Sequence, residues 1–142
     1  MDRGKSLVTS ENGSRDLTDR SKVRILLCDT DVESCQEIFT LLTQCSYQVT
    51  PAFTATDVFD ALNCDGPRTD IILAEANLLM TNGGKILKYL KREKEFKQIP
   101  VIMMVTENEV SLVLKALGLG ASDYLVKPLH NNALMNLWAH LQ

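Results

Sequence analysis

Short, unbroken apolar runs alternate along this chain with stretches in which apolar residues recur every three to four positions. The clearest run covers residues 71–74, with Asp70 before it and Glu75 after it. A short continuous apolar run is typical of a strand buried on both faces, as in a parallel sheet covered by helices. Similar runs predict four more strands, at residues 22–28, 47–52, 101–105 and 124–126.

The segments between these runs have helical periodicity, because their apolar residues fall on one face at a period of 3.6. Asp31 is predicted to cap the first helix, Asn131 or Asn132 is predicted to cap the last, and Gly83-Gly84 predicts a flexible loop. The predicted inward residues, helix by helix, are Cys35, Ile38, Leu42 and Cys45; Val58, Ala61 and Leu62; Ile86, Leu87 and Leu90; Val110, Val113, Leu114 and Leu117; and Leu134, Leu137, Trp138 and Leu141.

Strand and helix alternate five times, which predicts an α/β fold with a parallel sheet, helices on both faces and right-handed crossovers. Five such units in about 120 residues favour the flavodoxin-like strand order 2-1-3-4-5. We expect one domain over residues 21–142. Residues 1–20 are polar and lack apolar periodicity, so we expect a disordered tail there.

Composition and charge argue against several classes of function. The net charge is −3 and the sequence pI is about 5.3, which argues against nonspecific binding of nucleic acid by this segment. No apolar run reaches the roughly 20 residues that span a bilayer, and the polar start does not resemble a signal peptide. Four cysteines without a CxxC pair favour reduced, mostly buried thiols in an intracellular protein. The basic run Lys85, Lys88, Lys91 and Arg92 is interpreted as a solvated helix face, with partner binding as the alternative.

Candidate chemistry lies where the predicted strands end, since the carboxyl ends of parallel strands meet at one edge of a sheet. The residues expected to gather there are Asp29, Thr30 and Asp31; Glu75; Val105 and Thr106; and Lys127.

From about residue 22 to its end, the chain resembles a response-regulator receiver domain. The resemblance rests on Ile-Leu-Leu-Cys-Asp ending at Asp29, Ile-Pro-Val-Ile-Met-Met ending at Met104, and Gly-Ala-Ser-Asp-Tyr-Leu-Val-Lys-Pro ending at Pro128. It implies an aspartate phosphoacceptor after the third strand, two acids that hold Mg²⁺, and a hydroxyl and a lysine that grip the phosphoryl oxygens.

Several family positions are altered in this sequence. Asp29, Lys127 and the switch aromatic Tyr124 match the pattern. The replaced positions are the phosphoacceptor, occupied by Glu75; the second metal acid, occupied by Thr30; the switch hydroxyl, occupied by Val105; and the proline after the acceptor, occupied by Leu79. A misplaced carboxylate, a missing hydroxyl and a missing acid each weaken phosphoryl transfer or its readout.

Two interpretations of Glu75 remain. The favoured one is that its carboxylate pairs with Lys127 and simply satisfies the pocket. The other is that it mimics a phosphorylated acid and holds the domain in an active-like state. Asp29 and Asp31 are expected either to retain weak metal affinity or, for Asp31, to serve only as a helix cap. No cofactor and no metal site are predicted.

The chain resembles most closely the plant pseudo-response regulators of the circadian clock, in the class named for timing of CAB expression. The resemblance rests on the segments 45–50, 70–75 and 136–140 as well as the motifs above. It implies a nuclear clock protein that represses transcription, whose receiver-like domain associates with itself, with family members and with other clock proteins. The family's DNA-contacting motif is absent from this segment.

The predicted function is phosphorylation-independent protein–protein interaction, without enzymatic activity. The alternative is a working receiver phosphorylated at Glu75, and a third, weaker hypothesis is a flavodoxin-like cofactor binder, which would need a phosphate loop after the first strand. In the family, association commonly uses the face formed by the fourth helix, fifth strand and fifth helix. The candidate interface residues there are Leu112, Ala116, Leu119 and Tyr124.

Overall fold

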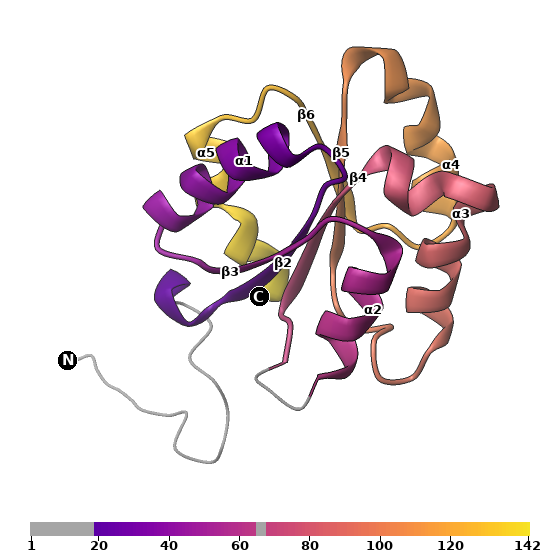
Figure 1. Cartoon of the computed structure of the whole chain (residues 1–142), viewed down its shortest axis with the longest axis horizontal. Helices are drawn as coiled ribbons and strands as arrows, with labels where there is room; N and C mark the ends of the chain where they lie inside the picture. Colours follow the sequence, from indigo (N-terminus) through magenta and orange to yellow (C-terminus); the bar gives the residue numbers. More distant parts are fainter. Residues whose placement is uncertain (1–18, 65–67) are drawn as a thin grey trace.

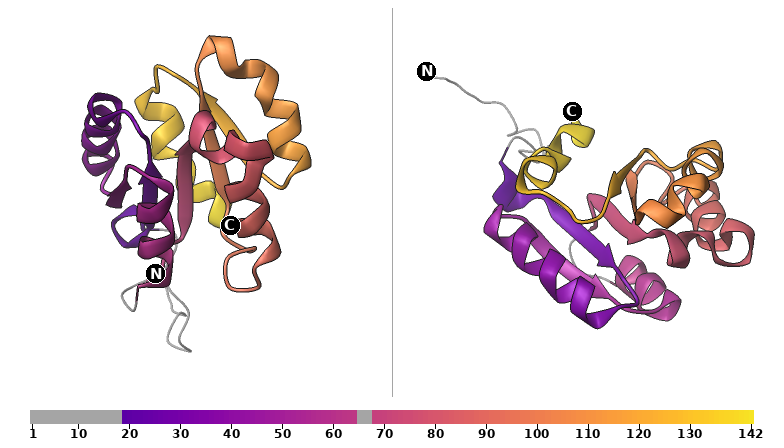
Figure 2. Two further views of the ribbon diagram at one scale, coloured as in Figure 1. Left: turned by 45° about the vertical axis from the view of Figure 1, so that its right-hand side comes forward. Right: turned by 90° about the horizontal axis from the view of Figure 1, so that it is seen from above.

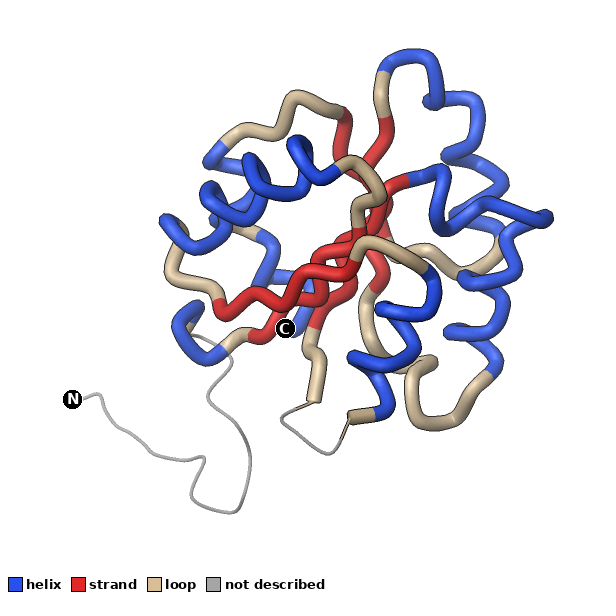
Figure 3. The backbone as a smooth tube through the Cα atoms, in the orientation of Figure 1, coloured by secondary structure: helices blue, strands red, loops and turns tan. Residues whose placement is uncertain are grey.

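Five parallel strands form the centre of the computed structural model, which describes residues 19–64 and 68–142. Their order across the sheet is β3-β2-β4-β5-β6, which is the predicted order 2-1-3-4-5 (Figures 1 and 3). The strands are β2 (Arg24–Cys28), β3 (Gln48–Ala52), β4 (Ile71–Glu75), β5 (Val101–Val105) and β6 (Asp123–Val126). The predicted α/β flavodoxin-like fold is therefore confirmed.

Helices cover both faces of the sheet, as the two views in Figure 2 show. The α-helices are α1 (Val32–Gln44), α2 (Ala55–Asn63), α3 (Ala76–Arg92), α4 (Val113–Gly118) and α5 (Asn131–Met135). The described residues also form three short 3₁₀ helices, η2 (Arg20–Lys22), η3 (Glu107–Leu112) and η4 (Leu137–Leu141).

Two apolar cores lie on opposite sides of the sheet, because successive residues of a strand point to opposite faces. Leu27 and Leu73 pack with α1, α5 and η4, whereas their neighbours Leu26 and Ala74 pack with α2, α3 and α4. Such continuous burial explains why the strands read as unbroken apolar runs, since helices cover both faces.

The register of the strands brings their ends to one edge. Cys28 of β2 pairs with Ala74 of β4, and Val105 of β5 pairs with Val126 of β6. The residues that follow these pairs, among them Asp29, Glu75 and Lys127, therefore leave the sheet at the same edge.

Most helix predictions are confirmed. In α1, Cys35, Ile38 and Leu42 are buried, and Asp31 caps the helix by accepting hydrogen bonds from two backbone N–H groups of the first turn. In α3, the chain turns out of the helix at Asn82–Gly84, where all three residues have positive φ, so the predicted break is present.

The predicted inward face of the fourth helix is confirmed at Val113 and wrong at its other three positions. Val113 and Ala116 are buried, whereas Leu114 is 83% exposed and Val110 and Leu117 are also exposed. The segment before α4 is the 3₁₀ helix η3, with 3.0 residues per turn instead of 3.6, so the apolar stripe changes phase at the junction.

This phase change also corrects the candidate interface residues. Ala116 is fully buried, and Leu112 and Leu119 are partly buried against the core on the α2–α3–α4 side. Tyr124 alone among the four is exposed, at 39%.

At the end of the chain, His130 occupies the N-cap position of the last helix without a side-chain cap bond, so the predicted asparagine cap is wrong. The segment divides into α5 and η4, and Leu134 and Leu137 are buried as predicted. Tyr47 holds this segment, since its hydroxyl donates to the carbonyl of Met135 and accepts from the N–H of Trp138.

The structure also bears on the expectations for Lys91, for the four cysteines and for the N-terminal tail. Lys91 does not face water as predicted, because its ammonium donates to the Ile99 carbonyl at 2.8 Å and burial lowers its pKa. The four cysteines are free thiols, three of them buried. The predicted disordered tail lies outside the described residues except at its end, where Arg20 belongs to η2.

Candidate functional site

Two carboxylates are buried at the strand ends. Asp29 follows β2 and is 0% exposed, and Glu75 ends β4 and is 9% exposed. A buried carboxylate is costly unless hydrogen bonds or a cation satisfy it. We call the group formed by Asp29, Thr30, Ser34, Glu75 and Lys127 the acid pocket, because it contains these two acids and the donors that bond them.

Asp29 is satisfied by three donors from this chain. One oxygen accepts the backbone N–H of Asp31 at 3.0 Å, and the other accepts the Ser34 hydroxyl at 2.7 Å and the Lys127 ammonium at 3.0 Å. Lys127 also donates to the Ser34 hydroxyl oxygen at 2.8 Å. Burial alone would raise the pKa of Asp29, but these hydrogen bonds and the lysine charge together lower it.

Glu75 has a different partner. Its Oε1 accepts the backbone N–H of Thr30 at 3.0 Å and also a short hydrogen bond from the Thr30 hydroxyl. Burial raises the pKa of Glu75 and the neighbouring Asp29 carboxylate raises it further, while the two bonds from Thr30 act in the opposite direction. The favoured expectation that Glu75 pairs with Lys127 is therefore wrong.

The altered residues Thr30 and Glu75 complement each other. A carboxylate at residue 30 would place a third negative charge beside Asp29 and Glu75, whereas the Thr30 hydroxyl supplies a donor. The extra methylene of Glu75, compared with an aspartate, extends its carboxylate toward the loop after β2, and there it meets Thr30. Two departures that looked like separate defects in the sequence form one hydrogen-bonded pair in the structure.

Sequence reasoning missed Ser34, which bonds both Asp29 and Lys127. The available signal was its position in the first turn of the helix that follows Asp29, since that turn faces the strand ends. A serine there looks ordinary in the sequence because it also suits the start of a helix.

In the described part of the chain, the side chains at the switch positions donate no hydrogen bond to the acid pocket, although the Lys127 N–H donates to the carbonyl of Val105 at 2.7 Å. Val105 is fully buried in the core. Thr106, one residue later, is the N-cap of η3, where its backbone N–H donates to the carboxylate of Glu109 at 2.9 Å. Tyr124 lies partly exposed on β6.

The residues of the acid pocket do not fit a Mg²⁺ ion. Mg²⁺ needs octahedral oxygen ligation, whereas both oxygens of Asp29 accept hydrogen bonds from protein donors, one of them an ammonium. Asp31 is engaged in capping α1. Within residues 19–64 and 68–142, no group of three or more His, Cys, Asp or Glu side chains is placed to hold a metal ion.

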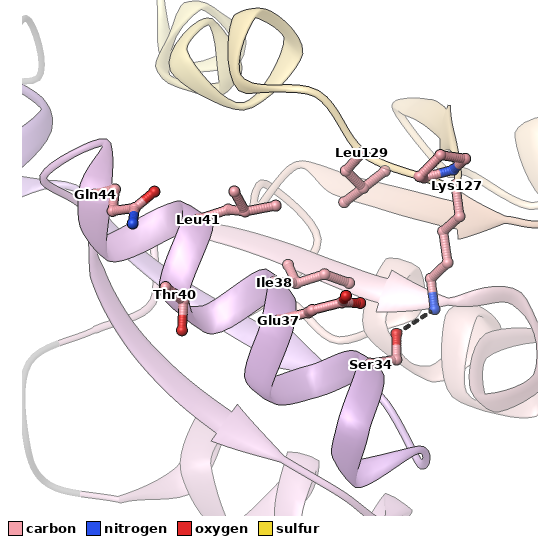
Figure 4. A pocket seen from close by; sticks show the side chains of 9 residues that line it. Ser34, Glu37, Ile38, Thr40, Leu41, Gln44, Lys127 and Leu129 are labelled. Atoms are coloured by element: carbon pink, nitrogen blue, oxygen red, sulfur yellow. Dashed lines mark hydrogen bonds between the residues drawn. The ribbon is translucent and has the colours of Figure 1, made fainter.

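A hollow opens beside the acid pocket, between α1 and the segment that connects β6 to α5. It has a volume of about 620 Å³, and Ser34 and Lys127 form one end of it, as Figure 4 shows. Ile38, Leu41 and Leu129 supply apolar walls, and Glu37, Thr40 and Gln44 are further polar residues on α1. The Ser34–Lys127 bond thus lies at the boundary between the acid pocket and this hollow.

Comparison with known protein families now identifies the fold's relatives. The model of the response regulator receiver domain matches residues 25–139. This chain belongs to that family. The receiver is 57% identical to the two-component response regulator-like protein APRR1 of Arabidopsis thaliana, over 91% of this chain and 21% of that protein.

Other relatives agree. The receiver is 53% identical to the response regulator-like protein PRR1 of rice, Oryza sativa subsp. japonica, over 91% of this chain and 25% of that protein. The chain therefore spans about a fifth to a quarter of the length of these curated relatives. The resemblance to plant pseudo-response regulators is confirmed by this likeness.

Solved structures support the fold. Full-length FixJ from B. japonicum aligns with a TM-score of 0.73 at 24% identity, covering 84% of this chain and 58% of that one. The chemotaxis regulator CheY4 of Vibrio cholerae aligns with a TM-score of 0.70 at 21% identity, covering 84% and 98%. None of the helices in the described part of the receiver is long and apolar enough to cross a membrane.

Proposed function

We propose that this receiver is a phosphorylation-independent, non-enzymatic association domain of a circadian-clock transcriptional regulator that works in the nucleus. The observation that carries the proposal is the closure of the acid pocket on its own donors. The clock and nuclear parts rest on the resemblance to plant pseudo-response regulators. The proposed partners are a second copy of this chain, related receivers and other clock proteins, with no direct contact to nucleic acid.

The acid pocket supports this proposal through the geometry of Glu75. The oxygen that accepts two hydrogen bonds from Thr30 is held inside the loop after β2, and Thr30 stands where a metal acid would be required. Val105 has no hydroxyl to hold a phosphoryl oxygen. A working receiver phosphorylated at Glu75 remains the alternative, and it would have to break these bonds first.

A surface on the η3–α4–β6 part of the receiver supports association. The side chains of Leu114 and Val110 are 83% and 45% exposed, and those of Val126, Leu117 and Tyr124 are 39–40% exposed. Tyr124 and Val126 point to the same side of β6 as α4, because Leu125 between them packs in the opposite core. We call these five residues the α4–β6 face. Large exposed apolar groups that gather on one surface are typical of protein interfaces.

The first test measures self-association by analytical ultracentrifugation across a range of concentrations. Leu114→Asp is expected to weaken association at least about tenfold, because it places a charge at the most exposed apolar position of the face. Val32→Asp, at a 54% exposed position on α1, is the matched control and should leave association unchanged. Association that is equal in the native chain and in Leu114→Asp would refute this use of the face.

The second test addresses phosphorylation directly. Amide NMR spectra are recorded while Mg²⁺ and then beryllofluoride are added to the native chain and to a Glu75→Asp, Val105→Thr double variant. We expect no shifts in the native chain. Shifts that spread from Glu75 to Tyr124 in the native chain would overturn the proposal in favour of a working receiver.

A further inference from the structure

A second hollow lies on the other side of the sheet, between α2 and α3, which are neighbours on one face in Figure 1. Its volume is about 500 Å³. Its apolar lining includes Phe59 of α2 and Ile86 and Tyr89 of α3, and its rim carries Lys85, Lys88 and Arg92. We call this site the basic groove, defined by those six residues.

Positive charge is concentrated at this groove. Lys85, Lys88 and Arg92 are exposed and follow one another at intervals of three and four residues, so they lie along one side of α3. None of the residues that line the hollow is acidic, although the whole chain has a net charge of −3. Arg92 pairs with Glu93 at 3.8 Å, with the two side chains 71% and 40% exposed, and such a surface pair is weak.

The apolar part of the groove is firmly built. The rings of Phe59 and Tyr89 meet edge to face with centroids 5.0 Å apart, and Tyr89 also contacts Phe96 at 6.2 Å. The break of α3 at Asn82 contributes to the same hollow. The basic run therefore lies at the rim of an aromatic hollow instead of facing only water. The helical periodicity of the sequence did not indicate this hollow.

We propose that the basic groove binds an acidic amphipathic helix of a protein partner. Apolar side chains on one face of that helix would enter the hollow over Phe59 and Tyr89, and flanking Asp or Glu residues would meet Lys85, Lys88 and Arg92. This is the helix-in-groove mode of recognition, here with complementary charge at the rim. Three cations on an acidic domain are a small footprint for nucleic acid, whose binding grows with the number of phosphates neutralised.

The basic groove is separate from the α4–β6 face, because it is built from α2 and α3 and shares none of the five residues of that face. This inference therefore goes beyond the proposed association function and does not rest on it. A protein that fails to self-associate through Leu114 can still bind an acidic helix at Lys85 and Lys88.

The probe is a synthetic helical peptide of about 16 residues, long enough for roughly four turns, with leucines on one face and glutamates beside them. Binding to the full chain is followed by amide NMR and by fluorescence anisotropy. We expect shifts at Phe59, Lys85, Lys88 and Tyr89. Peptides with glutamate replaced by glutamine, or leucine by alanine, are each expected to bind at least about tenfold more weakly.

Matched variants decide whether the groove itself is responsible. Lys85→Glu combined with Lys88→Glu is expected to weaken peptide binding at least about tenfold. Lys94→Glu combined with Lys97→Glu changes the net charge equally at exposed positions after α3, and should leave binding unchanged. Unchanged thermal melts would establish that both variants are folded.

Four outcomes would overturn the proposal. They are the absence of peptide binding, shifts confined to another surface, equal loss in the groove and control variants, and groove-dependent binding of anionic phospholipid vesicles without binding of the peptide. Loss of self-association in the groove variant would also overturn it, since a second copy of the chain would then be the occupant.

Discussion

The acid pocket and the α4–β6 face differ in how their side chains are satisfied. The polar side chains of the pocket are hydrogen-bonded within the chain, whereas the apolar side chains of the face are exposed to solvent. In the pocket, buried Asp29 and Glu75 find donors within the chain, at Lys127, Ser34 and Thr30. On the face, Leu114 is 83% exposed and nothing in the described part of the chain covers it. A buried polar site is stable only when it is closed, and closure leaves little capacity for a new ligand. Covering an exposed apolar surface removes it from water, which is favourable for association.

Residue 105, which connects the acid pocket to the η3–α4 segment in the family pattern, is also altered in this chain. In the family pattern a hydroxyl at residue 105 grips a phosphoryl oxygen, whereas Val105 has no hydroxyl and packs in the core. The structure thus gives the pocket no polar group at that position through which to move η3 and α4.

Removing the cation of the acid pocket is expected to have the largest effect. Lys127→Met leaves the fully buried Asp29 carboxylate without its charged partner, although Ser34 and the Asp31 N–H still donate to it. The expected loss is about 2–3 kcal/mol in the free energy of unfolding, measured by urea denaturation. Lys94→Met at an exposed site should change it by less than about 0.5 kcal/mol. A loss in Lys127→Met no larger than this control would mean that the pocket is not held by the lysine.

Two leucines on the same helix region separate packing from association. Leu119 is partly buried against the core, with its Cδ1 close to Gly84, so Leu119→Asp is expected to cost about 2 kcal/mol in unfolding free energy. Leu114→Asp should cost less than about 0.5 kcal/mol, because the side chain it replaces is already in solvent. Thermal and urea unfolding of both variants measure the difference. Equal costs would remove the distinction between core and face on α4.

These two leucines also show where sequence reasoning stopped. The strands were predictable because burial on both faces leaves unbroken apolar runs, and the strand order followed from five strand–helix units. The phase of the fourth helix was not predictable from a single 3.6 period, since the 3₁₀ helix η3 precedes α4 and rotates the stripe. Val113 was placed correctly and Leu114 was not, although they are adjacent.

The acid pocket was predictable in its members but not in its pairs. Parallel strand ends bring Asp29, Glu75 and Lys127 to one edge, which sequence alone implies. Which donor meets which acceptor depends on side-chain length and on the path of the loop after β2. The pairing of Glu75 with Thr30 therefore depends on the extra methylene of Glu75 and on the Thr30 hydroxyl. Ser34 was not predicted because the first turn of the helix was considered only for its cap at Asp31.

A smaller effect is expected when the Thr30 hydroxyl is removed. Thr30→Val keeps the shape of the side chain and the backbone N–H bond to Glu75 but removes the hydroxyl bond. The expected loss is about 1 kcal/mol in the free energy of unfolding. Thr40→Val is the control, because the Thr40 hydroxyl donates only to the carbonyl of Gln36 on the exposed side of α1. An unchanged free energy of unfolding in Thr30→Val would show that the hydrogen bond between the Thr30 hydroxyl and Glu75 contributes no stability.

The smallest effect is expected in the pH dependence of Glu75→Gln, because the amide keeps both the volume and an oxygen that accepts from Thr30. The pKa of Glu75 is raised above its ordinary value of 4.5 by burial and by Asp29, so the native state holds its proton more tightly than the unfolded state does. For such a carboxyl, unfolding free energy is highest below 4.5 and falls as pH rises toward the folded pKa. We therefore expect the stability of the native chain to decline relative to Glu75→Gln as pH rises above 4.5, in urea unfolding measured from pH 4 to about 8. Because Asp29 and Glu75 interact, the difference between the two curves reports the titration of this pair of carboxyls. Parallel curves would contradict the raised pKa of Glu75, since they would mean that the native and unfolded states hold its proton equally tightly.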